Sequence, residues 1–374
     1  YFSIFGHNLK FDKKKSSDLK VKKILITTGG TGGHVVPAQI IKDHLEDEFE
    51  IFFSTDLRGL KYLSSKINKT ILIDTPKFDV SIYLPFRILK LIYLVFKSLI
   101  LLKKNNIKKI ISIGGYMSLP IIISAAILRL PIFLVEPNLV LGRGNKFFLK
   151  FANKILCYSN KLNNFPEKYL KKIEIIKPLI SKNYFELFKK DNLNDKFCFL
   201  IFGGSQGAKV FEDIFVEIIS KISKNFSIKV IQQTNKENIH NLKNFYNSCG
   251  IENIIFDYDK NLANLIHISD LCITRAGATS LAEISFLEKP FIAIPLPTSK
   301  DNHQMKNAEY YKKKGCCWIL DQKKINKDEL TNFFMNLLKD KTELLDKKKN
   351  LQKINHVCSW KNINQELKLI INEY

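Results

Sequence analysis

The stretch that decides the fold of this chain is an apolar run followed by clustered glycines, Ile24-Leu25-Ile26-Thr27-Thr28-Gly29-Gly30-Thr31-Gly32-Gly33-His34. The apolar run is typical of a buried strand, and the glycines predict a tight turn that leads into a helix from about Pro37. Proline suits the start of a helix, because its missing N–H would be unpaired there anyway. Such a turn exposes backbone N–H groups with no Cβ in the way, which favours an anionic ligand.

The same pattern returns in the second half of the chain. The apolar run at 198–202 is followed by Gly203-Gly204-Ser205-Gln206-Gly207 and by a helix over 211–222. Strands alternating with helices predict parallel, doubly wound α/β sheets, and two equivalent turns predict two domains that face a common cleft. Further strands are expected at 50–53, 71–73, 109–113, 131–135, 155–158, 228–232, 254–256, 271–274 and 291–294.

The length of 374 residues suits two domains, each with its own core. We expect an N-terminal domain, a linker and a C-terminal domain. Two further segments flank the domains, a loose extension and a final helix, and this helix can pack back on the first domain. The expected bounds are 1–20 for a loose extension, 21–180, 181–196 for the linker, 197–350, and 351–374 for the final helix.

The net charge of +23 implies an anionic partner, which leaves nucleic acid, an anionic lipid surface and phosphorylated substrates open. The basic residues are scattered and are not interleaved with aromatic residues along one element, so no nucleic acid is expected. The seven cysteines are odd in number and include no C-x-x-C pair. This usage is typical of a reduced, cytoplasmic protein without a metal site.

Residues 86–102 form the most apolar stretch of the sequence. Read as a helix, this stretch places Arg87, Lys90, Lys97 and Lys104 within roughly 100° of one another. The lysines argue against a membrane-spanning helix, and we expect residues 86–104 to lie on an anionic membrane surface. A core helix with one wet face is the alternative.

Local patterns also limit the chemistry. Neither glycine-rich turn has the spacing of a dinucleotide-binding fingerprint or of an ATP-binding P-loop. The spacing of Ser280 and Glu283 matches a helix capping box, which leaves a purely structural role open for Glu283. Residues 257–259 read Asp-Tyr-Asp, a pattern that some glycosyltransferases of another fold use to hold a metal ion, but here a loop acid pair is favoured. We predict no catalytic metal and no cofactor.

Six motifs, in order, together resemble the MurG family of glycosyltransferases. They span residues 24–320 and are Gly29–His34 with Pro37-Ala38, Gly114-Gly115-Tyr116-Met117-Ser118-Leu119-Pro120, Val135-Glu136-Pro137-Asn138 with Gly142 and Asn145-Lys146, Gly203–Gly207 with Ala208-Lys209, Arg275–Glu283, and Asp301–Gln304 with Asn307-Ala308.

The resemblance implies the GT-B architecture, in which two Rossmann-like domains enclose a cleft. It implies that the N-terminal domain binds the acceptor and the membrane and that the C-terminal domain binds the UDP-sugar. It implies inverting transfer of N-acetylglucosamine from UDP-N-acetylglucosamine to the muramoyl 4-hydroxyl of undecaprenyl-diphospho-muramoyl-pentapeptide, at the cytoplasmic face of a bacterial inner membrane, in peptidoglycan synthesis. Alternatives are a GT-B enzyme with another acceptor, such as a diacylglycerol, a UDP-N-acetylglucosamine epimerase, or a basic nucleic-acid-binding protein.

The resemblance also assigns roles to residues. His34 becomes a candidate base or a contact to acceptor phosphate, and Glu283 becomes the acceptor of the ribose hydroxyl bonds. Two roles remain open for Arg275, which could bind a phosphate group or brace a loop. The remaining substrate-binding candidates are Thr31, Gly32, Gly33, Asn138, Ser205, Gln206, Ala278, Thr279, Ser280, Leu281, Ala282 and Gln304, and the acceptor-loop candidates are Gly115, Tyr116, Ser118 and Glu136.

The chain departs from the family pattern on the donor side. The family's Asn-Pro-Val-Arg appears as Lys177-Pro178-Leu179-Ile180, so Ile180 cannot supply the expected cation. The family's His and Gln of His-Glu-Gln-Asn are Val135 and Pro137. These changes put the donor contacts in question.

Overall fold

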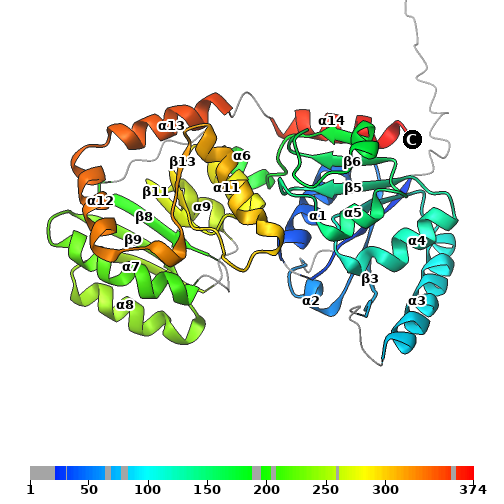
Figure 1. Ribbon diagram of the computed structural model, residues 1–374, viewed down its shortest axis with the longest axis horizontal. Helices are drawn as coiled ribbons and strands as arrows, with labels where there is room; N and C mark the ends of the chain where they lie inside the picture. Colours follow the sequence, from blue (N-terminus) through cyan, green and yellow to red (C-terminus); the bar gives the residue numbers. More distant parts are fainter. Residues whose placement is uncertain are drawn as a thin grey trace, which may run out of the picture.

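The computed structural model of the protein describes residues 22–30, 32–63, 69–76, 83–187, 195–203, 208–257, 261–354 and 359–374. Two lobes lie side by side, each built on one sheet (Figure 1). The sheet of the N-terminal lobe is parallel, with strands in the order β3-β2-β1-β4-β5-β6-β7. Its strands are β1 (Lys23–Thr27), β2 (Glu50–Thr55), β3 (Thr70–Leu72), β4 (Lys109–Ser112), β5 (Ile132–Glu136), β6 (Lys154–Cys157) and β7 (Ile173–Ile175).

The sheet of the C-terminal lobe is also parallel, in the order β10-β9-β8-β11-β12-β13. In both sheets the first strand of the lobe lies centrally, so the strand order reverses beside it. Ligands of doubly wound sheets bind in the crevice beyond the carboxyl ends of the strands at such a reversal. The strands are β8 (Phe197–Phe202), β9 (Ile228–Gln233), β10 (Glu252–Phe256), β11 (Leu271–Thr274), β12 (Phe291–Ala293) and β13 (Cys317–Ile319).

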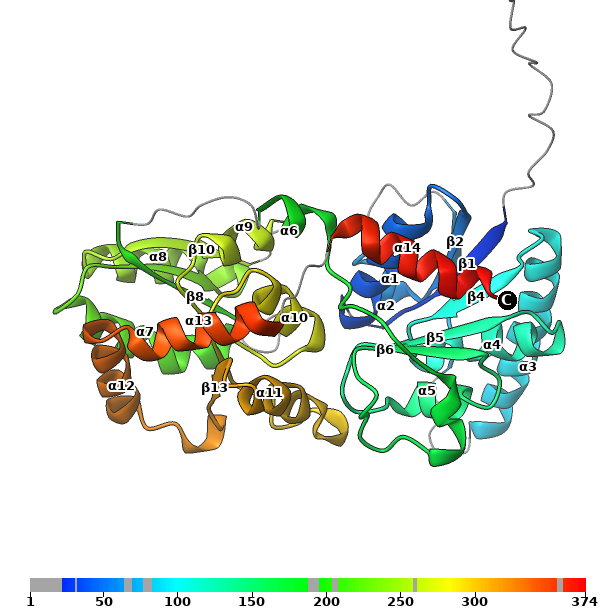
Figure 2. The same ribbon diagram turned by 90° about the horizontal axis from the view of Figure 1, so that it is seen from above.

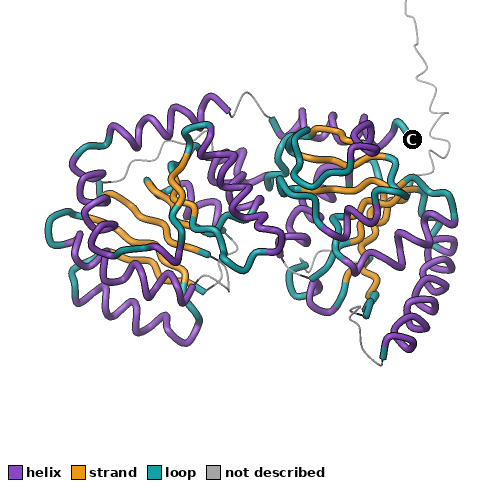
Figure 3. The backbone as a smooth tube through the Cα atoms, in the orientation of Figure 1, coloured by secondary structure: helices purple, strands orange, loops and turns teal. Residues whose placement is uncertain are grey.

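Helices flank both sheets (Figure 3). The strands read as continuous apolar runs because they are covered on both faces, and β1 and β8 are buried beyond their first residue. The predicted α/β, GT-B architecture is confirmed. The helices are α1 (Gly32–Leu45), α2 (Leu57–Leu60), α3 (Leu84–Lys104), α4 (Leu119–Ile127), α5 (Arg143–Phe148), α6 (Lys182–Leu187), α7 (Ala208–Ser223), α8 (Ile239–Ser248), α9 (Leu262–His267), α10 (Ala278–Phe286), α11 (His303–Lys313), α12 (Lys327–Lys339), α13 (Thr342–Ile354) and α14 (Trp360–Asn372), with 3-10 turns at Tyr116–Ser118, Glu167–Lys172, Lys236–Asn238, Lys300–Asn302 and Gln322–Lys324.

The first helix begins earlier than the sequence predicted. Helix α1 begins at Gly32, and Pro37 lies inside it. The left-handed conformation needed for the turn is taken by Gly30, with φ of 85°, so the chain can enter the helix soon afterwards. Pro37 then costs only the bond that its missing N–H would make to the carbonyl four residues earlier.

The last helix belongs to the N-terminal lobe. Ile363, Leu367 and Ile371 of α14 are buried in the same core as Ile24 and Ile26 of β1. Figure 2 shows α14 lying across the N-terminal lobe beside α1. The chain therefore passes between the lobes a second time after α13.

The segment 181–196, expected as a linker, contains a packed helix. Tyr184 and Leu187 of α6 are buried in the core of the C-terminal lobe, because the helix places both on the face that meets α9. The rest of the segment up to residue 194, and the expected extension at 1–20, lie outside the described residues.

Helix α3 leaves most of its surface uncovered. Only Leu94, Ser98 and Leu102 are buried, and they face α4. Figure 1 shows α3 at the outer edge of the N-terminal lobe. None of the helices in the described part of the chain combines the length and the apolarity needed to cross a bilayer. The large exposed side chains of α3 are Phe86, Ile88, Leu89, Ile92, Tyr93, Phe96 and Ile100.

Candidate active site

The first glycine-rich turn is held by the buried carboxylate of Asp56, which directly follows β2. Oδ1 accepts hydrogen bonds from the amides of Gly30 and Gly59, both at 2.8 Å. Oδ2 accepts from Nε of Arg58 at 2.9 Å. Burial alone would raise the pKa of Asp56, but the two amides and the guanidinium outweigh it and lower the pKa. Asp56 is therefore an ionised brace of the turn.

The second glycine-rich turn lies against the first. Gly114 and Gly115 have φ of 90° and 80°, a conformation that favours glycine. A Cβ on Gly115 would lie 3.7 Å from Nδ1 of His34, which is 3.2 Å from the carbonyl oxygen of Gly29. Tyr116 accepts a hydrogen bond from Arg58 at 2.9 Å. The structure thus gathers His34, Gly115 and Tyr116 at the carboxyl edge of the first sheet.

Ser118 is part of this turn but lies beneath it. Its side chain is fully buried. The hydroxyl donates to the carbonyl of Gly114 and accepts from the hydroxyl of Thr27, both at 3.2 Å. Both groups belong to the turn and its strand, so this geometry supports the backbone and leaves the hydroxyl away from the cleft.

Glu136 organises the loop that follows β5. Oε1 accepts from the backbone and side-chain nitrogens of Asn138, at 3.2 and 3.0 Å. Oε2 accepts from the amide of Gly142 at 2.8 Å and from Nδ2 of Asn145 at 3.1 Å. A Cβ on Gly144 would lie 2.9 Å from the nitrogen of Gly115. The loop is therefore pressed against the second glycine-rich turn.

The two lobes touch through this loop. Nδ2 of Asn307 donates to Oδ1 of Asn138 at 3.1 Å, and Oδ1 of Asn307 accepts from the amide of Leu139 at 3.0 Å. Near the rim, Arg143 makes a two-pronged pair with Asp301, at 3.1 and 2.9 Å. These contacts place Asn138 where the lobes meet.

Gln304 holds two loops of the C-terminal lobe together. Its Oε1 accepts from the amide of Ala276, which follows β11, at 3.2 Å. The same oxygen accepts from the amide of Leu296, which follows β12, at 2.9 Å. Its amide nitrogen has no hydrogen-bond partner within the described residues, so it can still donate to a ligand.

Helix α10 carries the predicted nucleotide segment, and it corrects one prediction. The helix begins at Ala278 with Gly277 as its N-cap, so Ser280 and Glu283 lie inside it and form no capping box. Glu283 instead meets the hydroxyl of Tyr184, and burial raises its pKa to about 7. The capping pattern was misleading because Gly277, which has no capping side chain, already serves as the cap.

The residues of the segment differ in exposure. Leu281 is fully buried in the core of the C-terminal lobe, whereas Ala278, Thr279 and Ser280 at the start of the helix are partly exposed. The free N–H groups of this first turn are suited to an anion. Thr31, Ser205, Gln206 and the Tyr258 and Asp259 of the acidic pattern lie outside the described residues.

Arg275 is a buried cation close to this helix start. Its Nη1 donates to the carbonyl of Ile294 at 3.1 Å, and the guanidinium lies 4.8 Å from the ring centroid of Phe211. Burial lowers its pKa. Nε and Nη2 are buried and have no hydrogen-bond partner within the described residues. Unpaired buried cations are costly, so this arrangement favours an anion nearby.

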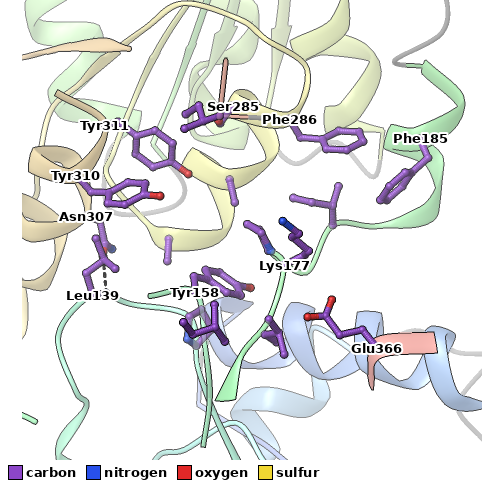
Figure 4. A pocket seen from close by; sticks show the side chains of 18 residues that line it. Leu139, Tyr158, Lys177, Phe185, Ser285, Phe286, Asn307, Tyr310, Tyr311 and Glu366 are labelled. Atoms are coloured by element: carbon purple, nitrogen blue, oxygen red, sulfur yellow. Dashed lines mark hydrogen bonds between the residues drawn. The ribbon is translucent and has the colours of Figure 1, made fainter. Parts of the chain in front are cut away.

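A cavity of about 360 Å³ lies between the lobes (Figure 4). Helix α10 contributes Ala278 and Ala282 to its wall, and α11 contributes Asn307. Ile180, where the family pattern has arginine, also lines it, and so does Lys177, three positions earlier on the same connection between β7 and α6. The aromatic side chains of the wall are Tyr158, Phe185, Phe286, Tyr310 and Tyr311.

Sequence reasoning missed Asp56, Arg58 and Asn307 as parts of the site. Asp56 and Arg58 follow the carboxyl end of β2, next to the reversal of strand order, and this position was the signal that could have found them. In the described part of the chain, no three His, Cys, Asp or Glu side chains gather as a metal site would require.

Two Rossmann-like lobes that meet through the loop after β5, with two glycine-rich turns at the carboxyl edge of the first sheet and a cavity between the lobes, define a glycosyltransferase of the GT-B class. Residues 24–157 match the glycosyltransferase family 28 N-terminal domain, and residues 198–361 match the glycosyltransferase family 28 C-terminal domain. The chain belongs to glycosyltransferase family 28 and, within it, to the MurG family.

Two curated relatives carry the same name, UDP-N-acetylglucosamine--N-acetylmuramyl-(pentapeptide) pyrophosphoryl-undecaprenol N-acetylglucosamine transferase. The protein of Pelagibacter ubique (strain HTCC1062) is 45% identical, over 94% of this chain and 99% of its own length. The protein of Rickettsia felis (strain ATCC VR-1525 / URRWXCal2) is 32% identical, over 89% of this chain and 95% of its own length.

Solved structures support the fold. The MurG of Acinetobacter baumannii matches with a TM-score of 0.76 and 20% identity, over 94% of this chain and 100% of that one. The UGT2 of Phytolacca americana matches with a TM-score of 0.68 and 11% identity, over 96% of this chain and 100% of that one. At these identities the likeness concerns the arrangement of the two lobes.

Proposed function

We propose that the protein transfers N-acetylglucosamine from UDP-N-acetylglucosamine to the muramoyl 4-hydroxyl of undecaprenyl-diphospho-muramoyl-pentapeptide, with inversion at the sugar. This is the step from lipid I to lipid II in peptidoglycan synthesis. The names of the relatives support it. The structural observation that supports this function is the hydrogen bond between Asn138 and Asn307. It joins the N-terminal lobe, which contains His34 and Tyr116, to the C-terminal lobe, which contains α10 and Gln304.

The acceptor would bind the N-terminal lobe, with His34 as the base. The carbonyl of Gly29 can only accept, so a hydrogen bond from Nδ1 of His34 requires the proton on that nitrogen. Nε2 is then free to take the proton of the 4-hydroxyl as its oxygen attacks the sugar. The bond from the sugar to the diphosphate breaks, and UDP leaves with the electron pair.

The donor would bind the C-terminal lobe. The first-turn amides of α10 and the buried Arg275 supply positive charge for the leaving diphosphate, and groups fixed before the reaction stabilise developing charge well. Glu283 would accept the ribose hydroxyls once it is ionised and released from Tyr184. Asn138 and Gln304 would contact the sugar. Each would use the hydrogen-bonding groups of its side chain that are not engaged by the protein's own loops.

Helix α3 would hold the enzyme on the cytoplasmic face of the membrane as a peripheral protein. Its exposed apolar side chains form a larger surface than an ordinary solvated helix presents. Arg87, Lys90, Lys97 and Lys104 lie among them, and basic residues favour anionic lipid.

The test is transfer of radiolabelled sugar from UDP-N-acetylglucosamine to a short-chain lipid I analogue. A diacylglycerol offered under the same conditions is the control. We expect transfer to the lipid I analogue alone. Equal transfer to both acceptors, or none by well-folded protein, would contradict the proposal.

A further inference from the structure

Arg58 lies where the two glycine-rich turns of the N-terminal lobe meet. Nη2 donates to the hydroxyl of Tyr116 at 2.9 Å and to Sδ of Met117 at 3.5 Å. A Cβ on Gly30 would lie 3.9 Å from the same nitrogen. Figures 1 and 2 both place α2, which carries Arg58, at the edge of this lobe nearest the C-terminal lobe. The guanidinium therefore contacts both glycine-rich turns of the N-terminal lobe.

The guanidinium keeps binding capacity in this position. Its side chain is 49% exposed, whereas that of Asp56 is 2% exposed. Asp56 is already engaged by two backbone amides and by Nε of Arg58. Nη1 has no hydrogen-bond partner within the described residues. The two N–H groups of Nη1 can therefore donate to phosphate oxygens, in directions that the planar guanidinium fixes.

The short helix that carries Arg58 also exposes apolar side chains. Leu57 and Leu60 are 57% and 45% exposed. A ligand that joins an anion to an apolar chain can place its anion on the guanidinium and its apolar part on this helix.

We propose that Arg58 binds the diphosphate of the lipid-linked acceptor and thereby sets the preference for a diphosphate over a monophosphate. This inference rests on the proposed function. It also places the muramoyl group beside the base, because Gly115 adjoins both Tyr116 and the imidazole of His34. The charge of the acceptor is then met in one lobe by Arg58, and that of the donor in the other lobe by Arg275.

The test compares Arg58→Gln and Arg58→Lys with Lys61→Gln, which removes an equal charge from an exposed position three residues away. Farnesyl diphosphate and farnesyl monophosphate serve as inhibitors competing with the short-chain lipid I analogue. Arg58→Gln should raise the acceptor KM and the farnesyl diphosphate inhibition constant by roughly tenfold or more, as expected for a lost charged hydrogen bond. The inhibition constant of the monophosphate should change less, and the KM for UDP-N-acetylglucosamine should not change.

Arg58→Lys keeps the charge without the fork, so an intermediate loss of diphosphate preference is expected. Lys61→Gln should behave as the unaltered protein. If Arg58→Gln weakens diphosphate and monophosphate equally, or weakens neither, the inference is overturned while transfer by the unaltered protein upholds the proposed function. If the unaltered protein transfers no sugar, calorimetric titration with farnesyl diphosphate and farnesyl monophosphate replaces inhibition. Selective loss of farnesyl diphosphate binding in Arg58→Gln would then uphold the anion site although the proposed function fails.

Discussion

Two buried carboxylates, Asp56 and Glu136, shape the acceptor side of the site without facing it. Each is bonded through both oxygens to groups of its own loop or of the neighbouring turn. A carboxylate that is ionised and fully bonded fixes backbone geometry and has little capacity left for proton transfer. Among the residues gathered at the two glycine-rich turns, His34 is therefore the titratable side chain best placed for the proposed role of base.

We expect Asp56→Asn to destabilise the N-terminal lobe. The amide oxygen of asparagine can still accept from Gly30 and Gly59, but the amide nitrogen that replaces Oδ2 cannot accept from Arg58, and the negative charge is lost. The free energy of unfolding should fall by about 1–3 kcal/mol, as for other buried bonds to charged groups. Urea titration measures it, with Asp213→Asn on the exposed face of α7 as the control. Equal stability of both variants would contradict the role given to Asp56.

Glu283 should make stability depend on pH. Burial raises its pKa from an ordinary 4.5 to about 7, so the folded chain holds this proton more tightly than the unfolded chain does. The free energy of unfolding should therefore fall as the pH rises between these two values, by roughly 3 kcal/mol in total, and stay level above them. Glu283→Gln should remove this contribution, which urea titrations across the window would reveal.

The affinity for UDP tests the second role of Glu283. An ionised carboxylate accepts hydrogen bonds from both ribose hydroxyls, whereas a protonated one accepts fewer. UDP affinity of the unaltered protein should thus increase as the pH passes 7, and that of Glu283→Gln should not. Parallel pH profiles for the two proteins would leave Glu283 with its contact to Tyr184 alone.

Among the helices, α3 packs on its lobe through few buried side chains and exposes a large apolar surface. Ile92 and Phe96 are 59% and 63% exposed, so replacing both with serine should leave the unfolding free energy nearly unchanged. Burying each side chain in a membrane is worth about 1.5–3 kcal/mol, so binding to anionic vesicles should weaken at least tenfold. Vesicle sedimentation measures this.

The control is Leu369→Ser on α14, where an equally apolar side chain is 73% exposed on another element. It should leave vesicle binding unchanged. Loss of binding in the control, or unaltered binding in the α3 variant, would show that α3 is not the membrane surface.

The elements also show what sequence can and cannot predict. The β1 and β8 runs and the glycines after β1 are local signals, so the parallel sheets and the first glycine-rich turn could be predicted. The edge strands β7 and β13, each three residues long, were missed. The start of α1 was misplaced because Gly32 and Gly33 look like turn residues but adopt helical geometry.

The site was predictable only where motifs are continuous in the chain. Asp56 braces Gly30 from 26 residues away, and no local pattern marks a partner at that separation. Asn307 was quoted only as part of a motif, and its bridge to Asn138 spans 169 positions and two lobes. Such contacts depend on how the sheets are placed, which residue spacing does not contain.

For the whole molecule, Asn307 is the central contact between lobes. Its side chain bonds to Asn138, to the amide of Leu139 and to the carbonyl of Ala276. Asn307→Ala should widen the range of lobe orientations and lower kcat/KM for both substrates, while each lobe keeps its fold. Small-angle scattering and steady-state kinetics measure the two effects. An unchanged scattering profile with normal kinetics would contradict this.

The exposed ion pair Arg143–Asp301 allows the contact between the lobes to be tested by exchanging its two charges. Arg143→Glu or Asp301→Arg alone should reduce turnover a few-fold, about the range that exposed pairs contribute. The double variant restores an ion pair with the charges exchanged, and it should recover much of the loss. High salt should reduce all of these differences. Additive losses in the double variant would show that the pair does not couple the lobes.

Helix α14 has a consequence for synthesis of the chain. The core around β1 is closed by Ile363, Leu367 and Ile371, which are synthesised after the whole C-terminal lobe. The lobe whose first strand is made earliest is therefore complete only after its neighbour has emerged from the ribosome. Folding of the N-terminal lobe during translation is thereby coupled to synthesis of the C-terminal lobe.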